Sequence, residues 1–212
     1  MTINIRCSRF RAANAPLRRT VYHRKALSVR DKITVFESLA VSVLLTNSGA
    51  WLPLRHQQNC KIDAAHRDGI QAVVRPRSRP SDTDSTPVNK LALDEAHLQA
   101  GTLPASVRIR LIRLRMLPRI IVHAPLGLRM LLDANTGDRT WADAVDCDRR
   151  WLLSHCHNPP AHLCGDFRTF LRSVALDTTV WLNLCLAGGR AAKAVHLESC
   201  RIRRWRQDLV KH

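Results

Sequence analysis

The chain has 212 residues, with 34 Lys and Arg against 17 Asp and Glu, and a formal net charge of +17. This balance excludes an acidic tail, a carboxylate-rich calcium-binding protein and most small soluble metabolic enzymes. Hydrophobic residues make up 45% of the chain and aromatic residues only 5%, so a core is expected to be built mainly from Leu, Val, Ile and Ala.

The basic residues are mostly arginine, 28 of the 34. Because the guanidinium group is a planar fork that matches phosphate, this bias favours contact with nucleic acid. The alternative is codon usage in a GC-rich gene or in a reading frame that encodes no selected fold. The seven cysteines are odd in number and no clear secretory signal precedes them, so we expect reduced thiols in the cytoplasm or nucleus, with a mitochondrion as the alternative.

Residues 1–66 are predicted to form a basic arm followed by a short apolar helix, without stable order. The first 30 residues hold eight basic residues and no acid, which is typical either of a disordered arm that docks on a polyanion or of an organellar transit segment. Residues 33–54 are mostly apolar, but Glu37 and residues 46–49 interrupt them. Since a bilayer needs about 20 apolar residues, we expect a buried helix over 39–45 that ends near Gly49, and no membrane partner.

Residues 67–88 are rich in Pro, Ser, Asp and Thr and are predicted to be a linker. Residues 89–212 are predicted to form a helical domain, and the fold class is therefore mostly α: a small irregular helical bundle in the C-terminal half with a poorly ordered basic N-terminal region. The predicted N-caps are Asn89, Thr140, Asp166 and either Asp177 or Thr178, and the predicted helix ends are Gly101, Pro118, Asn158 and Gly188-Gly189. A further short segment begins at Pro125, and the last segment places Val195, Ile202, Trp205 and Leu209 on one stripe.

Two acid-poor arginine clusters in this half are the candidate binding residues. On a helix, Arg108, Arg115 and Arg119 share a face while Arg110 and Arg113 point elsewhere. Clustered cations suit phosphate, and Trp205 can stack on an unpaired base or on an arginine. The alternative is a solvated helix face with arginine stems lying on apolar surface. The predicted nucleic-acid-binding residues are Arg108, Arg110, Arg113, Arg115, Arg119, Arg201, Arg203, Arg204, Trp205 and Arg206.

Neither a metal site nor a cofactor is predicted. Five potential zinc ligands lie between His155 and Cys164, but their spacing matches no usual zinc finger, which favours a polar loop between helices. Asp143, Asp146 and Asp148 are better explained as charges near a helix N-terminus than as a divalent-metal site. The sequence has no phosphate-binding glycine loop, no GxSxG and no HExxH motif, so no catalytic residue and no enzymatic activity are predicted.

From residue 107 to about 210, the order of features resembles the region downstream of the polymerase core in some non-LTR retrotransposon reverse transcriptases. The segments that carry the resemblance are RIRLIRLRML, HAPLGLRMLL and TWADAVDCDRRWL, followed by a helix pair containing Phe and Trp and by a basic C-terminus. The resemblance implies nucleic-acid binding without polymerase activity, because the aromatic-x-Asp-Asp motif of that family does not occur here. Residues 1–90 lie outside it.

The sequence therefore predicts a non-enzymatic, basic, helical protein that binds nucleic acid non-specifically through phosphate contacts, as a remnant of such a retroelement. Two alternatives stay open. One is an organellar protein with a cleaved N-terminal transit segment, and the other is the product of a spurious reading frame without a stable fold.

Overall fold

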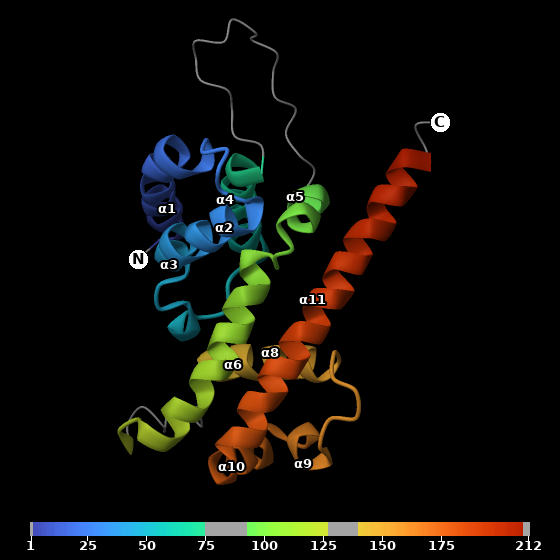
Figure 1. Ribbon diagram of the computed structural model, residues 1–212. Coiled ribbons are helices and arrows are strands. Elements are labelled where there is room, and N and C mark those ends of the chain that lie inside the picture. The colour runs from blue at the N-terminus through green and yellow to red at the C-terminus, as the bar shows by residue number, and fades with distance from the viewer. Residues whose placement is uncertain (1, 75–92, 127–139, 210–212) are drawn as a thin grey trace, which may run out of the picture. The chain divides into compact units, whose positions relative to one another are not determined.

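The computed structural model describes residues 2–74, 93–126 and 140–209, and every regular element within these ranges is a helix (Figure 1). This confirms the prediction of a mostly α-helical protein. The chain divides into two compact units. Unit 1 contains Met1–Thr46, His56–Ser106 and His196–His212, and unit 2 contains Asn47–Arg55 and Val107–Val195.

Unit 1 is built mainly from the first half of the chain. Its elements are α1 (Ile3–Leu17), the π-helical turn η1 (Arg18–Tyr22), α2 (Val29–Val35), the π-helical η2 (Phe36–Val41), α3 (Ser42–Leu45), α4 (His56–Val74), α5 (Leu93–Ala100) and the part of α11 (Thr178–Leu209) that begins at His196. The predicted linker at 67–88 therefore begins inside α4, and its remainder, like the predicted cap Asn89, lies outside the described residues.

The predicted lack of order in residues 1–66 is not confirmed, because a core forms around α1. This helix buries Cys7, Phe10, Asn14 and Leu17, whose spacing of three and four residues places them on one face. The Tyr22 hydroxyl is also buried and donates a hydrogen bond to the Asn14 side chain over 2.7 Å. Composition suggested a solvated arm because the exposed arginines lie between these core positions.

The helical region that covers the first part of the apolar segment 33–54 runs from Val29 to Leu45. It is longer than the helix predicted at 39–45. By length and composition, the stretch Val29–Ala50 could cross a membrane: its mean hydropathy is 1.3, and 44% of the tested window is buried inside the protein. The bent pair Phe167–Leu176 and Thr178–Arg206 meets the same criterion when taken together. Core helices of soluble proteins also meet it, so hydropathy alone assigns no membrane location.

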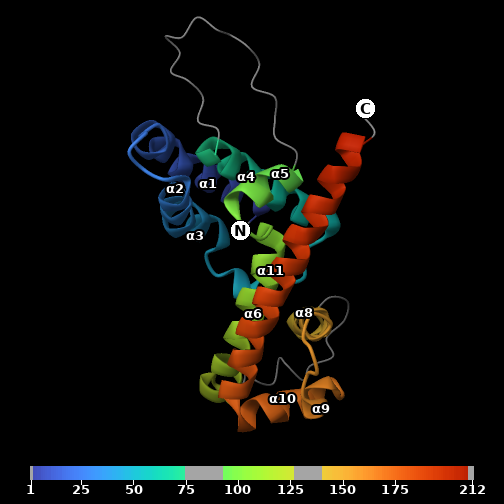
Figure 2. The same ribbon diagram turned by 45° about the vertical axis from the view of Figure 1, so that its right-hand side comes forward.

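The described helices of unit 2 pack around a leucine-rich core. Its elements are the 3₁₀ turn η3 (Ser48–Ala50), α6 (Ala105–His123, in this unit from Val107), α8 (Trp141–Leu153), α9 (Ala161–Cys164), α10 (Phe167–Leu176) and α11 as far as Val195. Both views show α10 at the start of α11, with α9 next to α10 (Figures 1 and 2). Leu114, Leu152, Leu163, Phe170 and Trp181 are fully buried.

The predicted N-caps of three helices are present in unit 2. Thr140 and Asp143 form the reciprocal capping box of α8, and Asp166 accepts hydrogen bonds from the first backbone amides of α10. Asp177, rather than Thr178, caps α11 by accepting from the amides of residues 179 and 180. The short segment predicted after Pro125 lies almost entirely outside the described residues.

The prediction that a helix ends at Pro118 is wrong, because α6 continues through it to His123. A proline inside a helix leaves the carbonyl four residues earlier without its helical donor. Here that carbonyl belongs to Leu114, and the buried indole N–H of Trp181 donates to it over 2.9 Å. A tertiary hydrogen bond thus replaces the missing helical one.

The prediction that a helix ends at Gly188-Gly189 is also wrong, since both glycines lie inside α11. A Cβ at Gly188 would stand 2.7 Å from Leu152 Cδ1 and 2.8 Å from Cys156 Sγ, and a Cβ at Gly189 would stand 3.4 Å from Leu111 Cδ1. The glycines therefore serve close approach between helices rather than termination.

Candidate nucleic-acid interface

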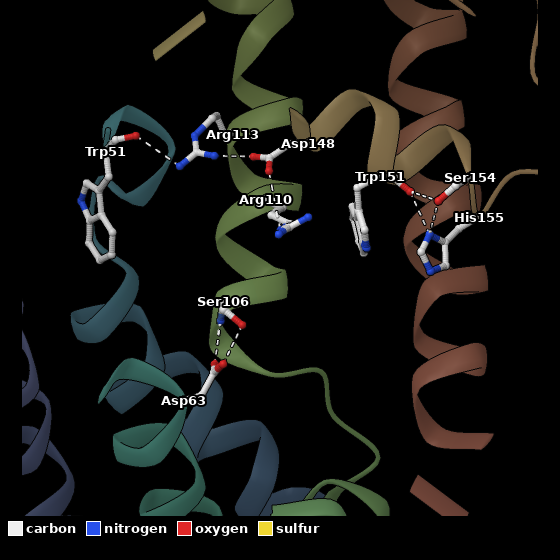
Figure 3. Close-up of polar contacts among 9 residues, drawn as sticks. All are labelled: Trp51, Asp63, Ser106, Arg110, Arg113, Asp148, Trp151, Ser154 and His155. Atoms are coloured by element: carbon white, nitrogen blue, oxygen red, sulfur yellow. Dashed lines mark hydrogen bonds and ion pairs between the residues drawn. The ribbon is translucent and has the colours of Figure 1, made fainter. Parts of the chain in front are cut away.

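The arginines of α6 divide into two groups, as the helical spacing predicts. Arg110 and Arg113 turn toward α8, where both form ion pairs with Asp148 (Figure 3). Arg113 and Asp148 are buried, with 4% and 3% of their surface exposed. Arg113 also donates to the carbonyl oxygen of Trp51 over 3.2 Å.

This buried ion pair holds unit 2 together and is poorly suited to bind a phosphate. Burial raises the pKa of Asp148, and the guanidinium groups of Arg113 and Arg110 oppose that rise. Arg110 is partly exposed, and its guanidinium lies 5.5 Å from the centre of the Trp151 ring. Arg113 would have to abandon a buried carboxylate in order to reach a ligand, at a cost of several kcal/mol. We therefore leave Arg113 out of the candidate surface.

The other three arginines of α6 point away from that ion pair. Arg115 and Arg119 are exposed, and Arg108 is half-buried. Within the described part of the chain, no carboxylate lies within ion-pair distance of Arg115 or Arg119. These two guanidinium groups present their positive charge to solvent.

The C-terminal cluster on α11 is the more exposed of the two. Every residue from Arg201 to Arg206 is exposed, and Trp205 has 63% of its surface accessible. Arg201 pairs with Glu198 over 3.0 Å, and Arg203 donates to the Cys200 sulfur over 3.4 Å. The stripe predicted from Val195 through Ile202 to Trp205 exists but is exposed, so it contributes no core.

Further exposed cations lie on α10 and α11 in unit 2, and sequence analysis did not single them out. Arg168 and Arg172 are four residues apart on α10, and Arg190 and Lys193 are three apart on α11. They are too widely spaced in the sequence to form a charge run. The sequence signal for them is helical spacing: i, i+4 for the pair on α10 and i, i+3 for the pair on α11. In each helix the apolar residues lie on the other face.

Side chains of the aspartate group 143–148 and of the His/Cys group 155–164 make local structural contacts. Asp143 caps α8, Asp146 pairs with Arg149 and Arg150, and His155 contacts the carbonyl oxygen of Trp151 through Nδ1 (Figure 3). Among the residues that the structure describes, no group of three or more His, Cys, Asp or Glu side chains is arranged to hold a metal ion.

Comparison with known proteins adds no relative: no protein-family model, no curated protein and no solved structure matches the chain. The resemblance to retroelement reverse transcriptases is a hypothesis that rests on the order of short segments.

Proposed function

We propose that this chain is a non-enzymatic, basic protein that binds nucleic acid non-specifically through phosphate contacts. The observation that carries the proposal is the exposure of the run Arg201–Arg206, which places four guanidinium groups at the surface within six residues. Each phosphate that such a group neutralises releases condensed counterions, which favours binding at low salt.

The distribution of charge supports a general rather than a base-specific interaction. Unit 1 contains 20 Lys and Arg against 10 Asp and Glu, and unit 2 contains 14 against 7, so both carry an excess of positive charge. A protein with a positive excess throughout attracts a polyanion over long range. Base-specific recognition needs side chains that read groove edges from a defined element, and the sequence contains no such motif.

The proposed binding residues in unit 2 are Arg115 and Arg119, with Arg108 on the same face of α6. Arg110, on the other face, is partly exposed and pairs with Asp148, so it is at most a secondary contact. We further propose that a small irregular bundle of α6, α8, α10 and α11 holds these residues in place. An origin from a degenerate retroelement reverse transcriptase would account for binding without catalysis, and it remains part of the proposal.

A filter-binding titration with single-stranded and double-stranded oligonucleotides at about 50 and 200 mM salt tests this function. The variant R204A/R206A removes two exposed charges from the C-terminal cluster. The matched control R67A/R150A removes two charges outside the C-terminal cluster, from arginines that pair with Asp68 and Asp146. Both variants have the same net charge, so a difference between them reports position rather than total charge.

We expect the logarithm of the affinity to fall linearly with the logarithm of the salt concentration, and R204A/R206A to reduce that slope by about 1–2. The control should change the slope less than R204A/R206A does. Absence of binding at the lower salt concentration, an affinity that ignores salt, or equal effects of the two variants would refute the proposal.

A further inference from the structure

The end of α11 combines cations with an exposed aromatic ring. Trp205 and Ile202 are 63% and 44% exposed and lie three residues apart on the helix. In the described part of the chain, no ring stacks on Trp205 and no hydrogen bond engages it. Leaving an indole ring in water forgoes about 2 kcal/mol of hydrophobic burial, so this ring is available to a ligand.

The arginines around Trp205 lie on all sides of the helix. At about 100° per residue, Arg201 is about 40° from Trp205 around the helix axis, and Arg204 and Arg206 lie about 100° away on its two flanks. Arg203 is about 160° away, on the opposite side. A rigid duplex lying against one side of a helix can reach only part of such a set, whereas a flexible strand can follow it around the helix.

We propose that the nucleic acid this surface selects is single-stranded, with one unpaired base stacked on Trp205 and its neighbouring phosphates bound by Arg201, Arg204 and Arg206. The inference rests on the proposed function and names its substrate class. A duplex hides the faces of its bases in the stack, while a single strand offers them to an aromatic ring. Phosphates are also the ligands that complement these charges.

An anionic membrane is the other polyanion that exposed Trp and Arg side chains can meet. Helices that lie in a membrane interface separate a cationic face from an apolar one. Around Trp205 the apolar sector is narrow, because Ile202 lies only about 60° from Trp205 and Arg201 and Arg206 border the two residues within about 40° on either side. This arrangement favours a nucleic-acid strand over a lipid surface.

The test measures the affinity of the full chain for an oligonucleotide of about 16 nucleotides, both as a single strand and as the matched duplex, by fluorescence anisotropy. The variants are W205A, W205F and, as a control on the opposite side of the same helix, R203A. Since residue 205 is exposed and Ala favours helix, W205A should retain the helical circular-dichroism spectrum. Vesicles containing phosphatidylserine form a separate arm.

We expect the wild-type chain to prefer the single strand. W205A should weaken single-strand binding about 5- to 100-fold and leave duplex binding within about twofold. W205F should keep most of the preference for the single strand, and R203A should lower the affinities for single strand and duplex by the same factor.

Equal losses for single strand and duplex in W205A, or no loss for either, would overturn the stacking inference while leaving the charge-driven function intact. Binding of neither oligonucleotide by the folded wild-type chain would refute the proposed function itself. Binding to vesicles that depends on Trp205, without a single-strand preference, would assign the surface to a membrane and overturn the inference.

Discussion

The hydrogen bond from Trp181 to the carbonyl oxygen of Leu114 gives the sharpest test of the fold. In W181F the indole N–H is lost, and the Leu114 carbonyl, which Pro118 deprives of its helical donor, becomes a buried acceptor without a partner. That loss costs about 1–3 kcal/mol, and the smaller ring at a fully buried site adds about 1 kcal/mol. We therefore expect W181F to lower the free energy of unfolding by about 2–4 kcal/mol.

The same substitution is also measured in a P118A protein. P118A restores an amide N–H at residue 118 that can bond to the Leu114 carbonyl. In that background W181F should cost less, because only the change in ring size remains. The four proteins form a double-mutant cycle in which urea denaturation, followed by circular dichroism, gives each free energy of unfolding. The expected coupling energy is about 1–2 kcal/mol. Additive effects within about 0.5 kcal/mol would show that Trp181 does not replace the missing helical bond.

Three further substitutions test other parts of the fold. G188A places a methyl group 2.7 Å from Leu152 Cδ1. Overpacking costs about 1–3 kcal/mol and the better helix propensity of Ala returns about 1, so we expect the free energy of unfolding to fall by up to about 2 kcal/mol in urea denaturation. A rise would contradict this close packing. D148N leaves Arg113 buried without its counter-charge and should lower the free energy of unfolding by about 3–5 kcal/mol, so a loss below about 1 would show that the pair is not buried in solution. Burial raises the pKa of Asp63, so its favourable contribution is complete below the ordinary carboxyl pKa and is lost as the pH rises through the raised value. The stability of the wild type relative to D63N should therefore fall as the pH rises above the ordinary carboxyl pKa of about 4, and a rise with pH would reverse the assigned direction.

The hydrogen bonds at Asp63 explain why the D63N comparison is informative. Asp63 accepts from the amide and the hydroxyl of Ser106, over 2.8 and 2.7 Å (Figure 3). An asparagine can accept from the same amide through its side-chain oxygen, so the variant removes the titration while retaining much of the contact.

The starts of α8, α10 and α11 and the end of α5 before Gly101 were predictable from the sequence, whereas the continuation of α6 and α11 past their expected ends was not. The caps at Thr140, Asp166 and Asp177 depend on a short side chain and the next three amides, so the local sequence determines them. Pro118 and Gly188 are equally clear local signals for an end, yet both lie inside helices. In each case a distant residue decides the outcome, through a hydrogen bond at Leu114 or through close packing against Leu152.

The candidate interface also has features that the sequence predicts and features that only tertiary contacts decide. Spacing along α6 separates Arg108, Arg115 and Arg119 from Arg110 and Arg113, and the sequence alone gives that much. Which of the two faces meets solvent depends on Asp148, a residue of another helix, and no local pattern names it as the partner of Arg113. The exposed cations Arg168 and Arg172 of α10 form no charge run in the sequence, and only their i, i+4 spacing on the helix places them on one face.

By itself, the sequence determined the net charge and the helical class. It also determined the starts of α8, α10 and α11 and the grouping of the arginines on helix faces, because these depend on residues within a few positions of one another. The tertiary structure alone decided that the basic N-terminus is held by a core, that Pro118 and Gly188 lie within helices, and that Arg113 is internal while Arg115 is exposed. These outcomes depend on burial and on contacts between residues far apart in the chain. A local pattern cannot specify them, since the same arginine is a binding group in water and a structural group beside a buried carboxylate.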